Sequence, residues 1–233
     1  MKIVDVEQGS HEWLIARLGK PTASRFDQIL TPGTRKYSKS AKTLRNRLLA
    51  EEILGYPMED VSNEWTHRGT EMESEAVSFY ELQRDVEVRR VGFVLRDDGL
   101  VGASPDGLVG ADGGLEIKCF SAPRHIECLL GDDPASMTQV QGCIWICERE
   151  WWDVLAYNPA FPPVLVRVNR DDKYISDLAA AVGKFLVDMD NARRKMQGLG
   201  TVGRVEDRDL KKQLRESIAF FGGSDPDDPP EAT

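Results

Sequence analysis

The chain lacks several features that would assign it to a class at once. No apolar run approaches the roughly 18 residues of a membrane-spanning helix, and the opening residues MKIVDVEQGS do not resemble a signal peptide. The four cysteines include no CxxC pair, and the three histidines lack ligand spacing. Cys143 and Cys147, four residues apart, fit two reduced thiols in a helix core. We therefore expect a reduced, cytoplasmic protein that makes no membrane contact.

A basic surplus is also missing, because the net charge of −9 is opposite to that of most nucleic-acid-binding proteins. The charge is, however, unevenly distributed. From Arg17 to Arg47 there are nine basic residues against one acid, Asp27, so that this segment carries +8 and the remainder −17. Such a division favours a localised anion-binding face, although a solvated helix surface with loose lysines would give the same count.

What is present is an alternation of helical and strand patterns that predicts an α/β domain with a central mixed sheet flanked by helices. The 233 residues suffice for one domain over 1–221, and the polar, proline-rich 222–233 is expected to be a disordered acidic tail. The expected helices are 11–19, 22–30, 40–54, 64–83, 122–130, 135–147, 171–195 and 206–220. The expected strands are 86–96, 100–105, 114–120, 152–159 and 164–170.

The segment SPDGLVGADGGLEIKC, residues 104–119, combines acids and a lysine with apolar strand residues. Residues two apart on a strand face the same side, so Glu116 and Lys118 share one face. Asp106 ends the preceding strand, and we expect the turn GLVGADGG to pair the two strands and bring all three side chains together. Clustered carboxylates favour Mg²⁺ or Mn²⁺, and an adjacent ammonium suits phosphodiester hydrolysis. Taken one at a time, each motif is more often structural.

Glu73 is a further candidate. On a helix it shares a face with Ala76, Val77 and Tyr80, which is a core-facing stripe. An acid there is costly unless it is paired or bound to a metal ion. Half-exposure or a salt bridge to a buried arginine is the alternative.

In order along the chain, these residues resemble the lambda-exonuclease/YqaJ family of phage recombination nucleases, within the PD-(D/E)XK superfamily. The resemblance runs from about residue 6 to about residue 195. It includes W…ARLGKPTAS (13–24), RGTEMESEA (68–76), GASPDGLVG (102–110), LEIKC (115–119), MTQVQGCIW (137–145), YNP (157–159) and RDDKY (170–174).

The resemblance implies a restriction-endonuclease-like core and a set of roles. Asp106, Glu116, Glu73 and the carbonyl of Ile117 would bind catalytic Mg²⁺, with Mn²⁺ as a substitute, and Lys118 would act on the attacking water. Further residues receive roles in the same way: Gln139 beside the active site, and Arg17, Ser24, Ser104 and, less cleanly aligned, Arg35 at the 5′-phosphate of DNA.

The implied function is Mg²⁺-dependent 5′-to-3′ exonuclease activity on double-stranded DNA ends, giving mononucleotides and a 3′ overhang. A homotrimer, a single-strand annealing partner and a phage or prophage origin in a bacterial host follow from the same resemblance. The alternatives are a PD-(D/E)XK endonuclease, a flap- or single-strand-specific nuclease, and a non-catalytic scaffold that binds DNA ends.

Overall fold

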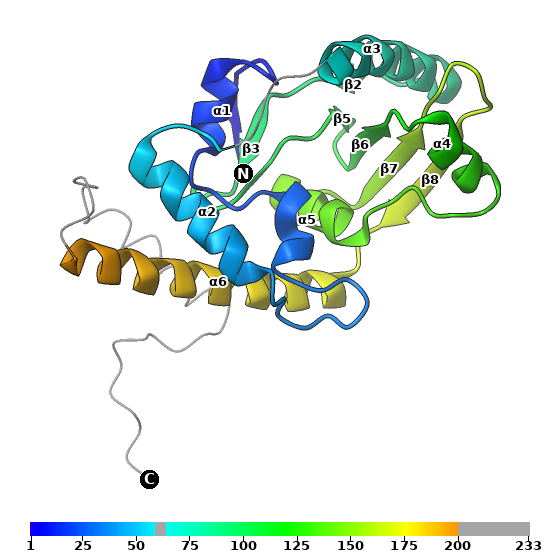
Figure 1. Ribbon diagram of the computed structural model, residues 1–233. Helices are drawn as coiled ribbons and strands as arrows, with labels where there is room; N and C mark the ends of the chain where they lie inside the picture. Colours follow the sequence, from blue (N-terminus) through cyan, green and yellow to red (C-terminus); the bar gives the residue numbers. More distant parts are fainter. Residues whose placement is uncertain (59–63, 200–233) are drawn as a thin grey trace.

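The computed structural model describes residues 1–58 and 64–199. Two sheets organise the fold (Figure 1). A three-stranded sheet has the order β1-β3-β4, and a five-stranded mixed sheet has the order β2-β5-β6-β7-β8, in which only β6 and β7 pair in parallel. The strands are β1 Lys2–Val4, β2 Val88–Arg89, β3 Phe93–Leu95, β4 Gly102–Ala103, β5 Gly107–Val109, β6 Gly113–Lys118, β7 Trp151–Ala156 and β8 Val164–Asn169.

Helices cover both faces of the larger sheet (Figure 1). On one face α3 packs its Ala76, Val77 and Tyr80 stripe against the strands. On the other face lies α5, with α6 and α2 behind it. The helices are α1 His11–Arg17, the 3-10 helix η1 Ala23–Gln28, α2 Ala41–Leu54, α3 Glu64–Arg84, α4 Ala122–Leu129, α5 Met137–Cys147 and α6 Asp172–Gly198.

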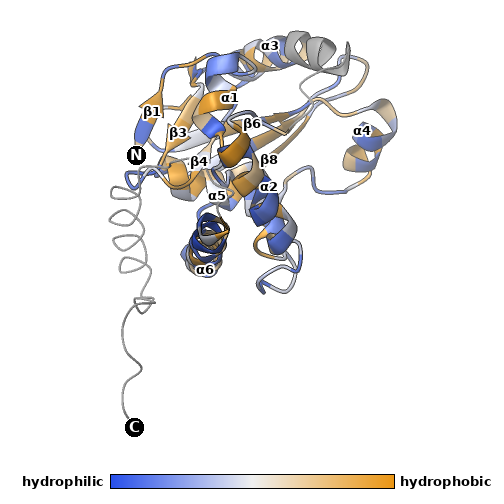
Figure 2. Ribbon diagram, turned by 60° about the vertical axis from the view of Figure 1, so that its left-hand side comes forward, coloured by the Kyte–Doolittle hydropathy of each residue, from blue (hydrophilic) through white to orange (hydrophobic). Residues whose placement is uncertain are grey.

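The burial pattern follows the hydropathy of these elements. The helix α5 is buried along almost its whole length and carries the hydrophobic colour in Figure 2, whereas α6 buries one side and keeps a hydrophilic one. Cys143 and Cys147 are buried free thiols on α5, as the helical spacing predicts. Gly142 lets η1 approach α5 closely, since a Cβ there would lie 2.6 Å from a ring carbon of Phe26. None of the helices within the described residues is long and apolar enough to cross a membrane.

Most expected elements are present, and the α/β architecture with a mixed, helix-flanked sheet is confirmed. The segment 22–30 forms a 3-10 helix, where an ordinary helix was expected. The expected pairing of 100–105 with 114–120 is wrong: β4 pairs with β3, and β5 pairs with β6. The chain changes sheets around Pro105, which has no N–H to continue a ladder. The expected helix 206–220 and the tail 222–233 lie outside the described residues.

Candidate active site

The candidate site is built at the end of β6. Its alternation puts Leu115 and Ile117 into the core under α3, while Glu116 and Lys118 face the opposite side. The Lys118 ammonium donates a hydrogen bond to Oε1 of Glu116 over 2.7 Å. The Glu116 carboxylate is almost fully buried, so this ammonium compensates a charge that water scarcely reaches.

Gln139, on the α5 helix that covers this face, completes a triangle with the same two side chains. Its Nε2 donates to Oε1 of Glu116 over 2.7 Å, and its Oε1 accepts from the Lys118 ammonium over 3.2 Å. Gln141, which repeats the motif two residues later, has a structural place. Its amide binds the Asn169 carbonyl and the Asp171 N–H, which ties α5 to the β8–α6 connection.

Asp106 reaches the site from the segment between the two sheets. Its Oδ2 accepts the Ile117 backbone N–H at 2.6 Å, so the carboxylate is tied to β6 between Glu116 and Lys118. Burial, together with the negative charges of Glu116 and Glu73, raises the pKa of Asp106 well above its usual range. A concentration of acids that repel each other in this way is a feature a divalent cation would stabilise.

Glu73 lies near enough to raise the pKa of Asp106. Its carboxylate is, however, bound to another side chain. Its Oε1 accepts from the guanidinium of Arg90 over 2.5 Å. Within the described part of the chain, no three His, Cys, Asp or Glu side chains converge closely enough to hold a metal ion. Asp106 and Glu116 offer the hard oxygens that Mg²⁺ prefers, with the Ile117 carbonyl in the same segment, so the donor chemistry fits. The Glu73 Oε1 would have to leave Arg90 to join them.

A second group of side chains lies against the same loop. The Arg17 guanidinium stacks 4.0 Å from the centre of the Trp13 ring and donates to the Ser104 hydroxyl over 3.0 Å. The Trp13 indole N–H also donates to Ser104, over 2.9 Å. Ser104 precedes Asp106 by only two residues. The hydrogen bond from Arg17 to Ser104 therefore places this arginine next to the segment that carries Asp106. Ser24 is exposed on η1 and lies 3.2 Å from the Thr22 hydroxyl.

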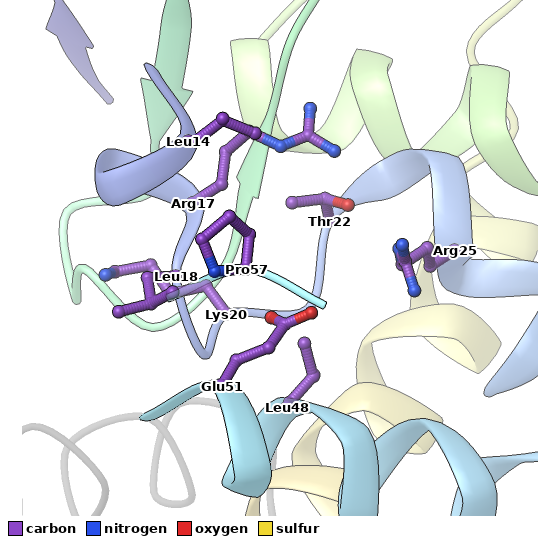
Figure 3. Close-up of a pocket in the computed structure, with 9 residues that line it drawn as sticks. All are labelled: Leu14, Arg17, Leu18, Lys20, Thr22, Arg25, Leu48, Glu51 and Pro57. Carbon is purple, nitrogen blue, oxygen red and sulfur yellow. The ribbon is translucent and has the colours of Figure 1, made fainter. Parts of the chain in front are cut away.

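A pocket opens beside Arg17, between α1, η1 and α2, as Figure 3 shows. Arg17, Lys20 and Arg25 line it, with Glu51 as an acid on the α2 side. Burial, reinforced by the charge of Arg25, lowers the pKa of Arg17 to about 10. Burial also lowers the pKa values of Lys20 and Arg25, the latter further through Arg47. Partly desolvated cations that repel one another favour the arrival of an anion.

Arg35 is not part of this group. Its guanidinium lies 3.6 Å from carboxylate oxygens of both Asp171 and Asp177 and stacks over the Tyr174 ring. The basic loop is therefore fastened to the start of α6 and contributes no arginine to the Arg17 pocket. The +8 segment divides accordingly, since Arg17, Lys20 and Arg25 face one pocket while Arg35 faces α6.

The contacts of Gln8 and Arg90 at this site are not predicted by the sequence. Gln8 donates from Nε2 to the carbonyls of Val91 and Pro105, at 2.9 and 2.8 Å, and so fixes the backbone just before Asp106. No pattern around Gln8 indicates this contact, because its partners are more than 80 residues away. The sequence suggests a salt bridge for Glu73, but no pattern identifies Arg90 as its partner.

The mixed sheet, with Asp106, Glu116 and Lys118 beside a buried helix, defines a PD-(D/E)XK-type nuclease fold. A model of the YqaJ-like viral recombinase domain matches residues 12–150, more than half of the chain, and the chain belongs to this family. No protein with curated annotation is a significant match.

Solved structures agree with this assignment. An alkaline exonuclease from Laribacter hongkongensis is 29% identical with a TM-score of 0.68, and its complex with dAMP is 30% identical with a TM-score of 0.69. Each covers 82% of this chain and 100% of its own. A phage-related exonuclease from Haemophilus somnus 129PT, 15% identical with a TM-score of 0.58, covers 76% of this chain and 96% of its own, and shares the fold.

Proposed function

We propose that the chain is a DNA exonuclease that requires Mg²⁺, with Mn²⁺ as a substitute, and degrades one strand of a duplex from its 5′ end. The products are mononucleotides and a 3′ single-stranded overhang. The family match and the similarity to alkaline exonucleases support the nuclease activity, and the dAMP bound to one of them is a mononucleotide.

The main support for this direction of digestion is the short distance along the chain between two groups of side chains. The segment from Ser104 to Asp106 connects the pocket lined by basic side chains with the carboxylate–lysine cluster. A 5′-terminal phosphate bound at Arg17 and Ser104 would be held close to the acids. Binding energy from that phosphate would then align the next phosphodiester with the site, which sets the direction of digestion. The helix-end amides around Ser24 would assist.

Each site residue has a task in this scheme. Asp106 and Glu116, with Glu73 and the Ile117 carbonyl, would hold the cation, which supplies Lewis-acid stabilisation of charge on the reacting phosphate. The Lys118 ammonium, held by Glu116 and Gln139, is both a proton donor and a positive charge beside these carboxylates. It can orient the attacking water and offset the negative charge that develops in the transition state.

The proposal extends to partners. Double-stranded DNA ends are the substrate, and a single-strand annealing protein would receive the overhang. A homotrimer that encircles DNA is also expected. The family resemblance alone supports the annealing protein and the trimer.

Linear duplexes labelled at one end test the function directly. With Mg²⁺, we expect mononucleotide release from the 5′ end, faster with a 5′-phosphate than with a 5′-hydroxyl, and no release after chelation by EDTA. Closed circular duplex and single strands serve as controls. Release from the 3′ end would overturn the polarity, cleavage of closed circles would indicate an endonuclease, and DNA binding without cleavage would indicate a scaffold.

The two arginines predicted at the 5′-phosphate should now behave differently. Arg17→Gln is expected to abolish most of the preference for 5′-phosphorylated ends, a loss of about tenfold or more, because a charge-assisted contact is removed. Arg35→Gln, which removes the same charge from the α6 contact, should leave the preference within about twofold of the original. Initial rates on paired phosphate and hydroxyl substrates give both ratios. Equal losses in the two variants would place Arg35 at the DNA end after all.

A further inference from the structure

The contact between Arg90 and Glu73 joins the candidate site to the link between two strands. Arg90 belongs to the link between β2 and β3, while Glu73 lies on α3, 17 residues earlier. Their side chains are 48% and 29% exposed, so both can still rearrange through water. An ion pair this exposed adds little to stability and is readily exchanged for another partner.

The backbone that carries Arg90 is, by contrast, fixed in place. Gln8 donates to the Val91 carbonyl, and the Trp13 indole donates to the Gly92 carbonyl over 3.2 Å. A Cβ at Gly92 would overlap the Val6 carbonyl oxygen, so the N-terminal segment lies directly against the link. Gln8 also binds the carbonyl of Pro105, next to Asp106. The base of the Arg90 side chain is therefore anchored to the loop that carries Asp106.

The three acids of the site have different partners. Lys118 compensates Glu116, and Arg90 compensates Glu73, which leaves Asp106 bonded through its Oδ2 only to a neutral N–H among the contacts described. A divalent cation that binds Asp106 and Glu116 would attract the Glu73 carboxylate as well. The Glu73 Oε1, which accepts from the Arg90 guanidinium at 2.5 Å, cannot fully serve both this guanidinium and a metal ion.

We propose that Arg90 competes with the divalent cation for the Glu73 carboxylate. Arg90 holds this carboxylate until the ion binds and then releases it. The inference rests on the metal site of the proposed function and deepens it. It accounts for the lack of three converging acids within the described residues while the donor chemistry fits a hard cation. Once the ion binds Glu73, the positive charge of the half-exposed Arg90 also becomes available to a DNA phosphate.

The test is direct titration of Mn²⁺ without DNA, followed by the electron paramagnetic resonance signal of the free ion and by calorimetry. Arg90→Gln should bind Mn²⁺ about three- to tenfold more tightly at low ionic strength, because a competing cation is removed. The gain should shrink as salt is added, since the pair is partly exposed to solvent.

Two further variants separate competition from a general charge effect. Arg89→Gln removes the same charge one residue away, from an exposed side chain on β2, and should change Mn²⁺ affinity by less than about twofold. In a Glu73→Gln background, Arg90→Gln should likewise have almost no effect, because the competed group is gone. A gain that persists in this background, or that Arg89→Gln reproduces, overturns the proposal.

A weaker or unchanged Mn²⁺ affinity in Arg90→Gln also overturns it, and a weaker one would make Arg90 a residue that positions Glu73 for the metal. Asp106→Asn distinguishes failure of the inference from failure of the metal site itself. If Asp106→Asn binds Mn²⁺ as tightly as the original chain, the carboxylates do not form the site, and both proposals fall. If Asp106→Asn loses binding and Arg90→Gln gains none, only the role of Arg90 is refuted.

Discussion

Replacing Lys118 by methionine is expected to slow digestion of linear, 5′-phosphorylated duplex by about 10²- to 10⁴-fold. Methionine keeps much of the length and bulk of the side chain but removes its charge and its proton donors. The ammonium contacts both Glu116 and Gln139, so its position is fixed before substrate arrives. Single-turnover digestion, with protein in excess over DNA ends, measures the chemical step and avoids effects on release.

A matched substitution controls for the loss of a lysine. Lys184→Met removes an exposed ammonium from α6, where it lies 3.4 Å from Asp188, and should leave the rate within about twofold. Melting curves and Mn²⁺ binding establish that Lys118→Met is folded and retains the acids. A folded Lys118→Met variant with more than about a tenth of the original rate would remove the ammonium from the mechanism.

Local sequence patterns predict which side chains share a face in β6 and in α3. The period-two alternation over 115–119 puts Glu116 and Lys118 on one face, and the structure places the ammonium and a carboxylate oxygen 2.7 Å apart. The helical stripe through Ala76, Val77 and Tyr80 is buried as expected. These features depend on backbone geometry that any strand or helix shares, so a single sequence is enough to read them.

Features that depend on contacts distant in sequence could not be derived in this way. Two-residue strands such as β4 have too little pattern to show which sheet they join, and the wrong pairing of 100–105 followed from that. The family resemblance suggests Arg35 at the 5′-phosphate, but acids at the start of α6, over 130 residues later, determine where its side chain points. The engagement of Glu73 by Arg90 was open as a salt bridge with no identified partner.

The largest unforeseen feature is a buried acid on β7. Asp153 is fully buried, although its position in the strand WWDVLA gives no reason to expect a partner. Its carboxylate accepts from the Tyr80 hydroxyl at 2.8 Å and from two nitrogens of Arg167, on the neighbouring strand, at 2.7 and 2.8 Å. Because Tyr80 is on α3, the network fastens to the sheet the same helix that carries Glu73.

Asp153→Ala is therefore expected to destabilise the protein by about 3 kcal/mol, the lower end of the range for breaking a buried ion pair. The lower end applies because the Arg167 side chain is 43% exposed, so its charge can be rehydrated, whereas the Tyr80 hydroxyl is left buried without its acceptor. For a domain of this size the melting temperature should fall by about 6–12 °C, measured by calorimetry or circular dichroism. Arg84→Gln, which removes a partly exposed partner 3.9 Å from the same carboxylate, should cost under about 1 kcal/mol. If Asp153→Ala melted no lower than Arg84→Gln, apolar packing beneath α3, and not this network, would be what holds the helix on the sheet.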